Sequence, residues 1–152
     1  MQEKLKKFRL VKLSLGLALL FLAALCFLNH FYSWQGNKIE TISIGEKIEI
    51  KAEKVVSDQK RYQGLSGRDS LCKNCGMLFI MPETAQQVFS MRGMRFGLDF
   101  IWIKDGQIVA LNKNVPWNYS GKIIADYPSE QVLEVLSGTC DKYGIEVGDK
   151  LF

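Results

Sequence analysis

The stretch from Leu98 to Leu111 constrains the fold more than any other part of this 152-residue chain. Residues Leu98–Ile103 are apolar at almost every position, which is typical of a strand covered on both faces. Asp105-Gly106 and then Gln107–Leu111 follow, and this order is typical of a β-hairpin with a two-residue turn. The first strand of this hairpin should therefore be central in a sheet.

Several other short segments also predict strands. Lys47–Glu53 alternates strictly between charged and apolar residues, which indicates a strand with one buried face. Three further stretches also predict short strands: Ile42–Ile44, Gly76–Met81 and Gln87–Met91. A last short strand is expected after Gly148-Asp149.

Few segments predict helices. Ser57-Asp58 can cap a short helix that runs through Tyr62 and that Gly64 would stop. Gly138–Tyr143 predicts a second short helix, whereas Val132–Leu136 fits either a strand or a short helix. We therefore predict a mainly β fold, with antiparallel strands in a barrel-like or sandwich arrangement and one or two short helices.

The N-terminal region has the features of a membrane anchor. Five basic residues lie in Lys4–Lys12, an apolar run follows at Leu13–Leu28, and aromatic residues continue to Trp34. About 20 apolar residues are needed to cross the hydrocarbon core, and aromatic residues favour its interface. We therefore predict an uncleaved transmembrane helix. The basic residues before it should keep the N-terminus in the cytoplasm.

Two alternatives to this signal anchor remain open. One is a cleaved signal peptide, and the other is a lipoprotein signal in which Cys26 would be the acceptor. All three readings place the following domain outside the cytoplasm, in the periplasm or the extracellular space. With an uncleaved anchor, the protein is a single-pass protein of the cell membrane. We divide the chain into the anchor (1–35), a connector with a leading strand (36–47) and a β-rich domain (48–152).

Charge and histidine content exclude several classes of function. Of the 20 basic and 16 acidic residues, five basic and one acidic precede the apolar run, which leaves 15 of each in the rest. A domain with balanced charge does not attract phosphate backbones, so nucleic acid is not an expected partner. The only histidine, His30, lies at the end of the predicted anchor. Its absence from the domain disfavours an enzyme with a Ser-His-Asp or Cys-His centre.

Cysteines give the sharpest chemical signal in the domain. Cys72 and Cys75 have the C-x-x-C spacing, and Cys140 is the third exported cysteine. The pair could form a local disulfide, remain as thiols, bind a soft metal ion such as copper or zinc, or take part in thiol redox chemistry. Met91 and Met94 could add thioether ligands to a soft metal, or pack as core residues.

Asp99 is a lone carboxylate in an otherwise apolar strand. A buried charge is costly unless it is paired or hydrogen-bonded, and an arginine fork suits a carboxylate. We expect its partners among the four domain arginines Arg61, Arg68, Arg92 and Arg95. The network could be structural, or it could line a pocket for a small polar or anionic ligand.

Three segments resemble one known family. They are Gly64-Leu65-Ser66-Gly67-Arg68, Gly76-Met77-Leu78-Phe79-Ile80, and the stretch Met91–Trp102. Together they are similar to the domain of unknown function 192 family, over about residues 48–152. The resemblance implies a compact, largely antiparallel β-barrel-like domain and no known reaction. The chain departs from the usual family pattern at Ser90, where the family has tryptophan, and at Gly97, where it has proline.

The sequence thus predicts a membrane-anchored, extracytoplasmic module that binds a small ligand or an envelope protein. Its ligand site should include Arg61, Arg68, Asp99 and the Met91–Arg95 loop. The alternative is a soft-metal or thiol-redox protein that uses the Cys72/Cys75 pair. No other cofactor is expected, and an enzyme is the least favoured reading.

Overall fold

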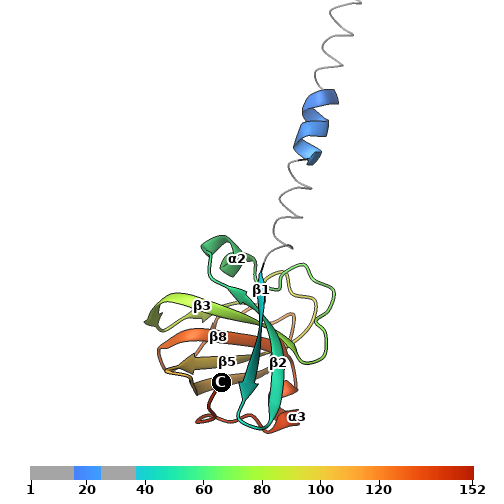
Figure 1. The fold of residues 1–152 in the computed structure, drawn as a ribbon. Coiled ribbons are helices and arrows are strands. Elements are labelled where there is room, and N and C mark those ends of the chain that lie inside the picture. Colours follow the sequence, from blue (N-terminus) through green and yellow to red (C-terminus); the bar gives the residue numbers. More distant parts are fainter. Residues whose placement is uncertain (1–15, 25–36) are drawn as a thin grey trace, which may run out of the picture. The chain divides into compact units, whose positions relative to one another are not determined.

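The computed structural model of the chain describes residues 16–24 and 37–152 (Figure 1). Residues 16–24 are helical, and residues Asn37–Phe152 form a separate compact unit. No helix within these described residues is long and apolar enough to cross a membrane. The remainder of the predicted anchor, with Cys26 and His30, lies outside the described residues.

The compact unit is mainly β, as predicted. Its elements in chain order are β1 (Lys38–Ile44), β2 (Ile48–Val55), α2 (Asp58–Gln63), β3 (Cys75–Ala85), β4 (Val88–Phe89), β5 (Leu98–Lys104), β6 (Gln107–Val115), β7 (Ile123–Ile124), β8 (Ser129–Leu136) and α3 (Thr139–Tyr143).

Six of the strands form one sheet in the order β1-β2-β3-β8-β5-β6, and β4 pairs with β7. In Figure 1, β3, β8 and β5 lie side by side in this order. The sheet is mixed, because β2 and β3 are parallel while the other neighbours are antiparallel. The parallel pair was not predicted. It arises because the chain leaves β2 through α2 and a long loop, a crossover that returns it in the same direction.

The two outer strands of the sheet, β1 and β6, do not pair directly with each other within residues 37–152. The C-terminal residues link them instead. Leu151 bridges to Ile44 at the end of β1, and Lys150 bridges to Gln107 at the start of β6. Ser43 and Phe152 also exchange two backbone hydrogen bonds, of 3.0 and 2.9 Å. The sheet is therefore not a closed antiparallel barrel, although its edges are covered at one end.

The core lies on both faces of the sheet. Along β5, Ile101 and Ile103 join one buried cluster, whereas Phe100 and Trp102 join another on the opposite face. β5 pairs with β8 on one side and β6 on the other, so the prediction of a central strand is confirmed. β8, and then β3 beyond it in the sheet, also carry buried residues on both faces.

Local signals explain most element boundaries. Asp105 and Gly106 both have positive φ, of 52° and 69°, as a tight type I′ hairpin turn requires. The helix α2 ends at Gly64, also with positive φ. One prediction was wrong: β3 does not stop at Pro82 but continues to Ala85, because the register shifts between Ile80 and Ala85 and a proline is tolerated at such an irregularity.

Candidate functional site

A cavity of about 370 Å³ opens beside α2. The end of α2 and the loop after it form one side, and the segment from β4 to Met94 forms the other. Phe79 of β3 and Glu134 of β8 come from the sheet itself. The lining residues are 61–66, Phe79, 88–90, Arg92, Met94 and Glu134.

Hydrogen bonds tie the two sides of the cavity together at its rim. The Ser66 hydroxyl donates to the Arg92 carbonyl at 2.7 Å, and the Gly67 N–H donates to the Gly93 carbonyl at 2.9 Å. The Arg92 guanidinium lies over the Tyr62 ring, 4.2 Å from its centroid, and donates to the Tyr62 hydroxyl. The rim is therefore held in one arrangement by contacts between segments that are far apart in the sequence.

Glu134 is the most unusual residue of the cavity. It is only 5% exposed, and on β8 it lies opposite Met77 of β3 and Phe100 of β5. Among the described residues no hydrogen-bond or ion-pair partner contacts its carboxyl group. Burial raises the pKa of Glu134 from 4.5 to about 8, so the carboxyl is mostly neutral at pH 7.

The walls around Glu134 are apolar and aromatic. Phe89 packs edge-on against Phe79, Phe100 and Trp102, with ring centroids 5.1, 5.8 and 5.6 Å away. Leu65 and Met94 belong to the same buried cluster and also line the cavity. Because rings and branched side chains fix each other by packing, the walls are preformed.

Two arginines supply the positive charge of the lining. Arg61 is held by the backbone, since it donates to the carbonyls of Val56 and Ile80 and pairs with Asp58. Among the described residues, the Arg92 guanidinium contacts only the Tyr62 side chain, so most of its five N–H donors are not used by contacts within the protein. With Glu134 neutral, the lining has a net positive charge.

Asp99 lies elsewhere, on the opposite face of the sheet. It is fully buried and accepts hydrogen bonds from the backbone N–H groups of Asn114, Gly138 and Cys140, at 2.7, 3.2 and 2.8 Å. The expected pairing with an arginine is wrong, because strand alternation directs Asp99 to the face of Ile101, where backbone donors satisfy it. Asp99 thus joins the end of β6 to the start of α3.

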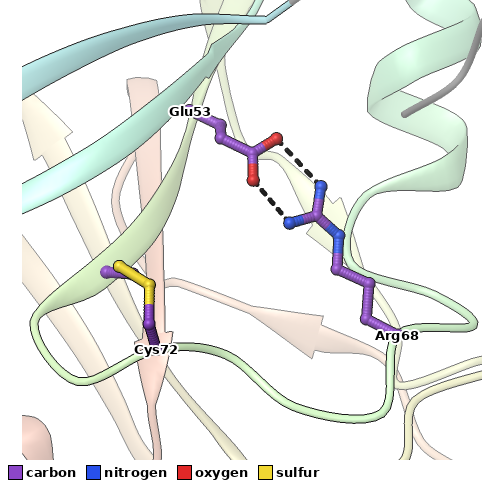
Figure 2. The surroundings of a disulfide bond; sticks show 4 residues. Glu53, Arg68 and Cys72 are labelled. Carbon is purple, nitrogen blue, oxygen red and sulfur yellow. Dashed lines mark hydrogen bonds and ion pairs between the residues drawn. A yellow bond between two sulfur atoms is a disulfide. The ribbon is translucent and has the colours of Figure 1, made fainter. Parts of the chain in front are cut away.

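Arg68 and Arg95 pair with carboxylates other than Asp99. Figure 2 shows the two parallel hydrogen bonds between Arg68 and Glu53, one of them 2.8 Å long. This contact holds the pKa of Glu53 below its ordinary value. Arg95 pairs with Asp69. Arg68 and Arg95 therefore brace the loop between α2 and β3 and do not line the cavity.

The other candidate residues divide in the same way. Met94 lines the cavity, whereas Met91 is buried in the core beside it. Cys72 and Cys75 form a disulfide (Figure 2), and Cys140 is free and buried. Burial and the charge of Asp99 raise the pKa of the Cys140 thiol to about 12, so it is not a reactive thiolate.

A metal centre has no support in the part of the chain that the structure describes. The two sulfurs of the C-x-x-C pair are bonded to each other, and no group of three His, Cys, Asp or Glu residues lies close enough to hold an ion. The pair precedes a strand, and no helix begins there to lower a thiol pKa. The disulfide is therefore best explained as a structural link in the loop before β3.

A second cavity, of about 770 Å³, lies beside this disulfide and is lined by Lys47, Lys51 and Lys73 among others. Lys47 donates to Asp149 and to the Gly144 carbonyl, both within 2.8 Å. Apart from Ile48, its lining residues are exposed or half-buried. This shallow basic surface is a weaker candidate for a specific site.

The sequence profile of the DUF192 family, described as an uncharacterised conserved family, matches residues 40–152. The chain belongs to the DUF192 family. No curated protein matches it.

Two solved structures share the fold of this DUF192 domain. One is a Sinorhizobium meliloti 1021 protein, provisionally named a transcription regulator, with a TM-score of 0.74 and 27% identity over 78% of this chain and 95% of that one. The other is a protein of unknown function from Novosphingobium aromaticivorans, with a TM-score of 0.72 and 25% identity over 78% of this chain and 87% of that one.

The three segments that carry the DUF192 resemblance meet at the cavity. Leu65 and Ser66 come from the first, Phe79 from the second, and Arg92 and Met94 from the third. Ser90, which replaces the usual tryptophan of the family pattern, lines the cavity as well. A smaller side chain at this position leaves more room in the cavity.

Sequence reasoning missed Glu134. The signal was the same as for Asp99, because Glu134 is the lone charged residue in the apolar stretch Val132–Leu136. The stretch fitted either a strand or a helix, so the side of the sheet on which the carboxyl lies was undetermined. Only the pairing of β8 between β3 and β5 places it at the cavity.

Proposed function

We propose that this DUF192 domain is a small-ligand-binding module whose site is the cavity above Glu134. The observation that carries the proposal is a buried carboxyl group that faces accessible space and has no partner among the described residues. Buried polar groups in folded proteins are almost always hydrogen-bonded, since an unmet one costs roughly 1–3 kcal/mol. A ligand that supplies the missing partner recovers this energy on binding.

The comparison with Asp99 shows why a purely structural role explains Glu134 poorly. Asp99 is also buried in a central strand, but three backbone N–H groups satisfy it. Glu134 receives no such donors from the described part of the chain and lies beside open space of about 370 Å³. This volume falls within the range of roughly 300–1,000 Å³ that is usual for small-molecule sites.

We further propose that the domain acts outside the cytoplasm, held to the membrane by the N-terminal segment. The basic cluster Lys4–Lys12 and the apolar run after it support this topology. A disulfide between Cys72 and Cys75 suits an oxidising compartment. The ligand would be a small molecule of the envelope. We do not extend the regulatory role named for the Sinorhizobium protein to this chain, because a domain with balanced charge does not attract nucleic acid.

Benzyl alcohol tests whether the cavity binds a ligand at all. The full-length protein, with ¹³C-labelled methionine methyl groups and in detergent, would be titrated and followed by NMR. We expect the methyl signal of Met94, which lines the cavity, to shift with a dissociation constant of about 1 mM, as an eight-atom ligand can provide.

The matched control is Ser90→Trp, which places a large ring in the same space. This variant should keep its fold by circular dichroism and lose the Met94 response. A Met94 signal that does not respond in the native protein, or that responds equally in Ser90→Trp, would contradict a ligand site in this cavity.

A further inference from the structure

We infer that the ligand is a small organic anion, a carboxylate on an aromatic or branched apolar body, which Glu134 binds as a neutral hydrogen-bond donor. The inference rests on the proposed ligand site and adds the chemical class of its occupant. Three features of the cavity point to it: the sign of the charge on the lining, the protonation state of the buried carboxyl and the apolar walls.

The charged groups of the lining favour an anion. They are Arg61, Arg92 and Glu134, and Glu134 is the one carboxyl group among the lining residues. Asp58 offsets the charge of Arg61, whereas the Arg92 guanidinium contacts the Tyr62 side chain and pairs with no carboxylate among the described residues. An arginine with free N–H groups at a cavity mouth can pair with a carboxylate through two parallel hydrogen bonds.

The surroundings of Glu134 favour its neutral form. The neighbouring strands present Met77 and Phe79 from β3, and Phe100 from β5, all of them apolar. Arg61 and Tyr62 of α2 and Arg92 of the facing loop are the other titratable or charged residues of the lining.

A neutral carboxyl group has one O–H donor to offer. An ammonium ligand would instead require Glu134 to ionise among apolar side chains and would place a third cation near two arginines. A carboxylate ligand needs neither, because it can accept the Glu134 proton in a hydrogen bond while its charge faces Arg92.

The apolar walls define the rest of the ligand. Phe79, Phe89, Leu65 and Met94 surround the space above Glu134. A ring or branched chain would pack against these side chains, and burying its apolar surface would add to the affinity. An inorganic anion would leave this surface uncovered.

Three compounds with the same ring but different charge test the inference: phenylacetate, benzyl alcohol and benzylamine. Each would be titrated into the full-length protein at pH 6.5 and pH 9, with the Met94 methyl signal as the readout. Phenylacetate should bind more tightly than benzyl alcohol at pH 6.5, and benzylamine most weakly. The affinity for phenylacetate should fall about tenfold at pH 9, because Glu134, whose pKa is about 8, is then mostly ionised.

Variants at two positions identify the groups that act on the ligand. Glu134→Gln keeps a donor at both pH values, so it should bind phenylacetate within about threefold of the native affinity and without the pH dependence. Glu134→Leu should weaken phenylacetate about tenfold or more, since the donor is lost. Arg92→Gln should weaken phenylacetate but leave benzyl alcohol unchanged.

The outcomes separate this inference from the proposed function. Benzylamine binding tighter than phenylacetate at either pH, or phenylacetate binding no tighter than benzyl alcohol at pH 6.5, would overturn the anion class and leave the ligand site intact. No response of Met94 to any of the three compounds would overturn both.

Discussion

Replacement of Glu134 by glutamine should make the protein more stable at neutral and alkaline pH. Glutamine keeps the shape and polarity of the side chain but cannot ionise. The pKa of Glu134 is about 8 in the folded chain, against an ordinary value of 4.5. Folding therefore favours the protonated carboxyl. The contribution of Glu134 to the free energy of unfolding is fully present below pH 4.5 and is lost as the pH rises toward 8.

The size of the effect follows from the same pKa values. Each pH unit between 4.5 and 8 costs the native protein about 1.4 kcal/mol, which gives an upper value of about 5 kcal/mol. Water that enters the cavity would reduce this value, so we expect a gain of about 2–5 kcal/mol for Glu134→Gln at pH 8. Such a gain is large beside the total stability of a domain, which is about 5–15 kcal/mol.

Urea denaturation of the full-length protein, followed by circular dichroism at several pH values, measures this difference. The gain should be near zero at pH 4.5, rise steadily to pH 8 and stay level above it. Glu130→Gln is the matched control, because Glu130 lies on the same strand but accepts a hydrogen bond from the Asp105 N–H. A difference between Glu134→Gln and the native protein that does not change with pH would refute the reasoning.

Three further predictions concern the supporting structure. Asp99→Ala should cost about 3–5 kcal/mol in urea denaturation, because three backbone N–H groups, that of Cys140 fully buried, lose their acceptor. Joint replacement of Cys72 and Cys75 by serine should cost only about 2 kcal/mol and leave ligand titrations unchanged, since the loop that the disulfide closes is short. Glu53→Gln should lower stability by about 1 kcal/mol at pH 7 and by little at pH 3, because the lowered pKa of Glu53 means that its pairing with Arg68 is lost as the pH falls.

Elements with strong local signals could be predicted from the sequence. The Asp105-Gly106 hairpin and the helix that ends at Gly64 depend on backbone conformations that few residues adopt, so their signals lie within a few positions. The parallel pairing of β2 with β3 has no such signal. It depends on where the chain goes after α2, which is a property of the whole sheet.

The candidate site could be predicted only in part. Arg61 and Met94 were expected to belong to it and do line the cavity. Asp99 and Glu134 look alike in the sequence, since each is a carboxylate in an apolar stretch. They differ in their hydrogen-bond donors. Asp99 accepts from backbone N–H groups that lie 15–41 residues away in the sequence, whereas no backbone N–H group of the described residues donates to Glu134.

The ion-pair partners of the arginines also could not be predicted from the neighbouring sequence. A long side chain pairs with the nearest carboxylate on its own side of the sheet, and this is decided by the path of the loop. Arg68 reaches Glu53 because the loop after α2 returns along β2 (Figure 2). The sequence shows which groups need partners but not which groups meet.

The most direct test of the account is the titration of the Glu134 carboxyl carbon by NMR, with and without phenylacetate. The signal can be assigned in ¹³C-glutamate-labelled protein by its absence from Glu134→Gln. We predict a midpoint near pH 8 in the free protein and a higher one with phenylacetate, because a bound anion favours the neutral carboxyl further. A midpoint near the ordinary value of 4.5, or one that phenylacetate leaves unchanged or lowers, would contradict the neutral donor and the anionic ligand.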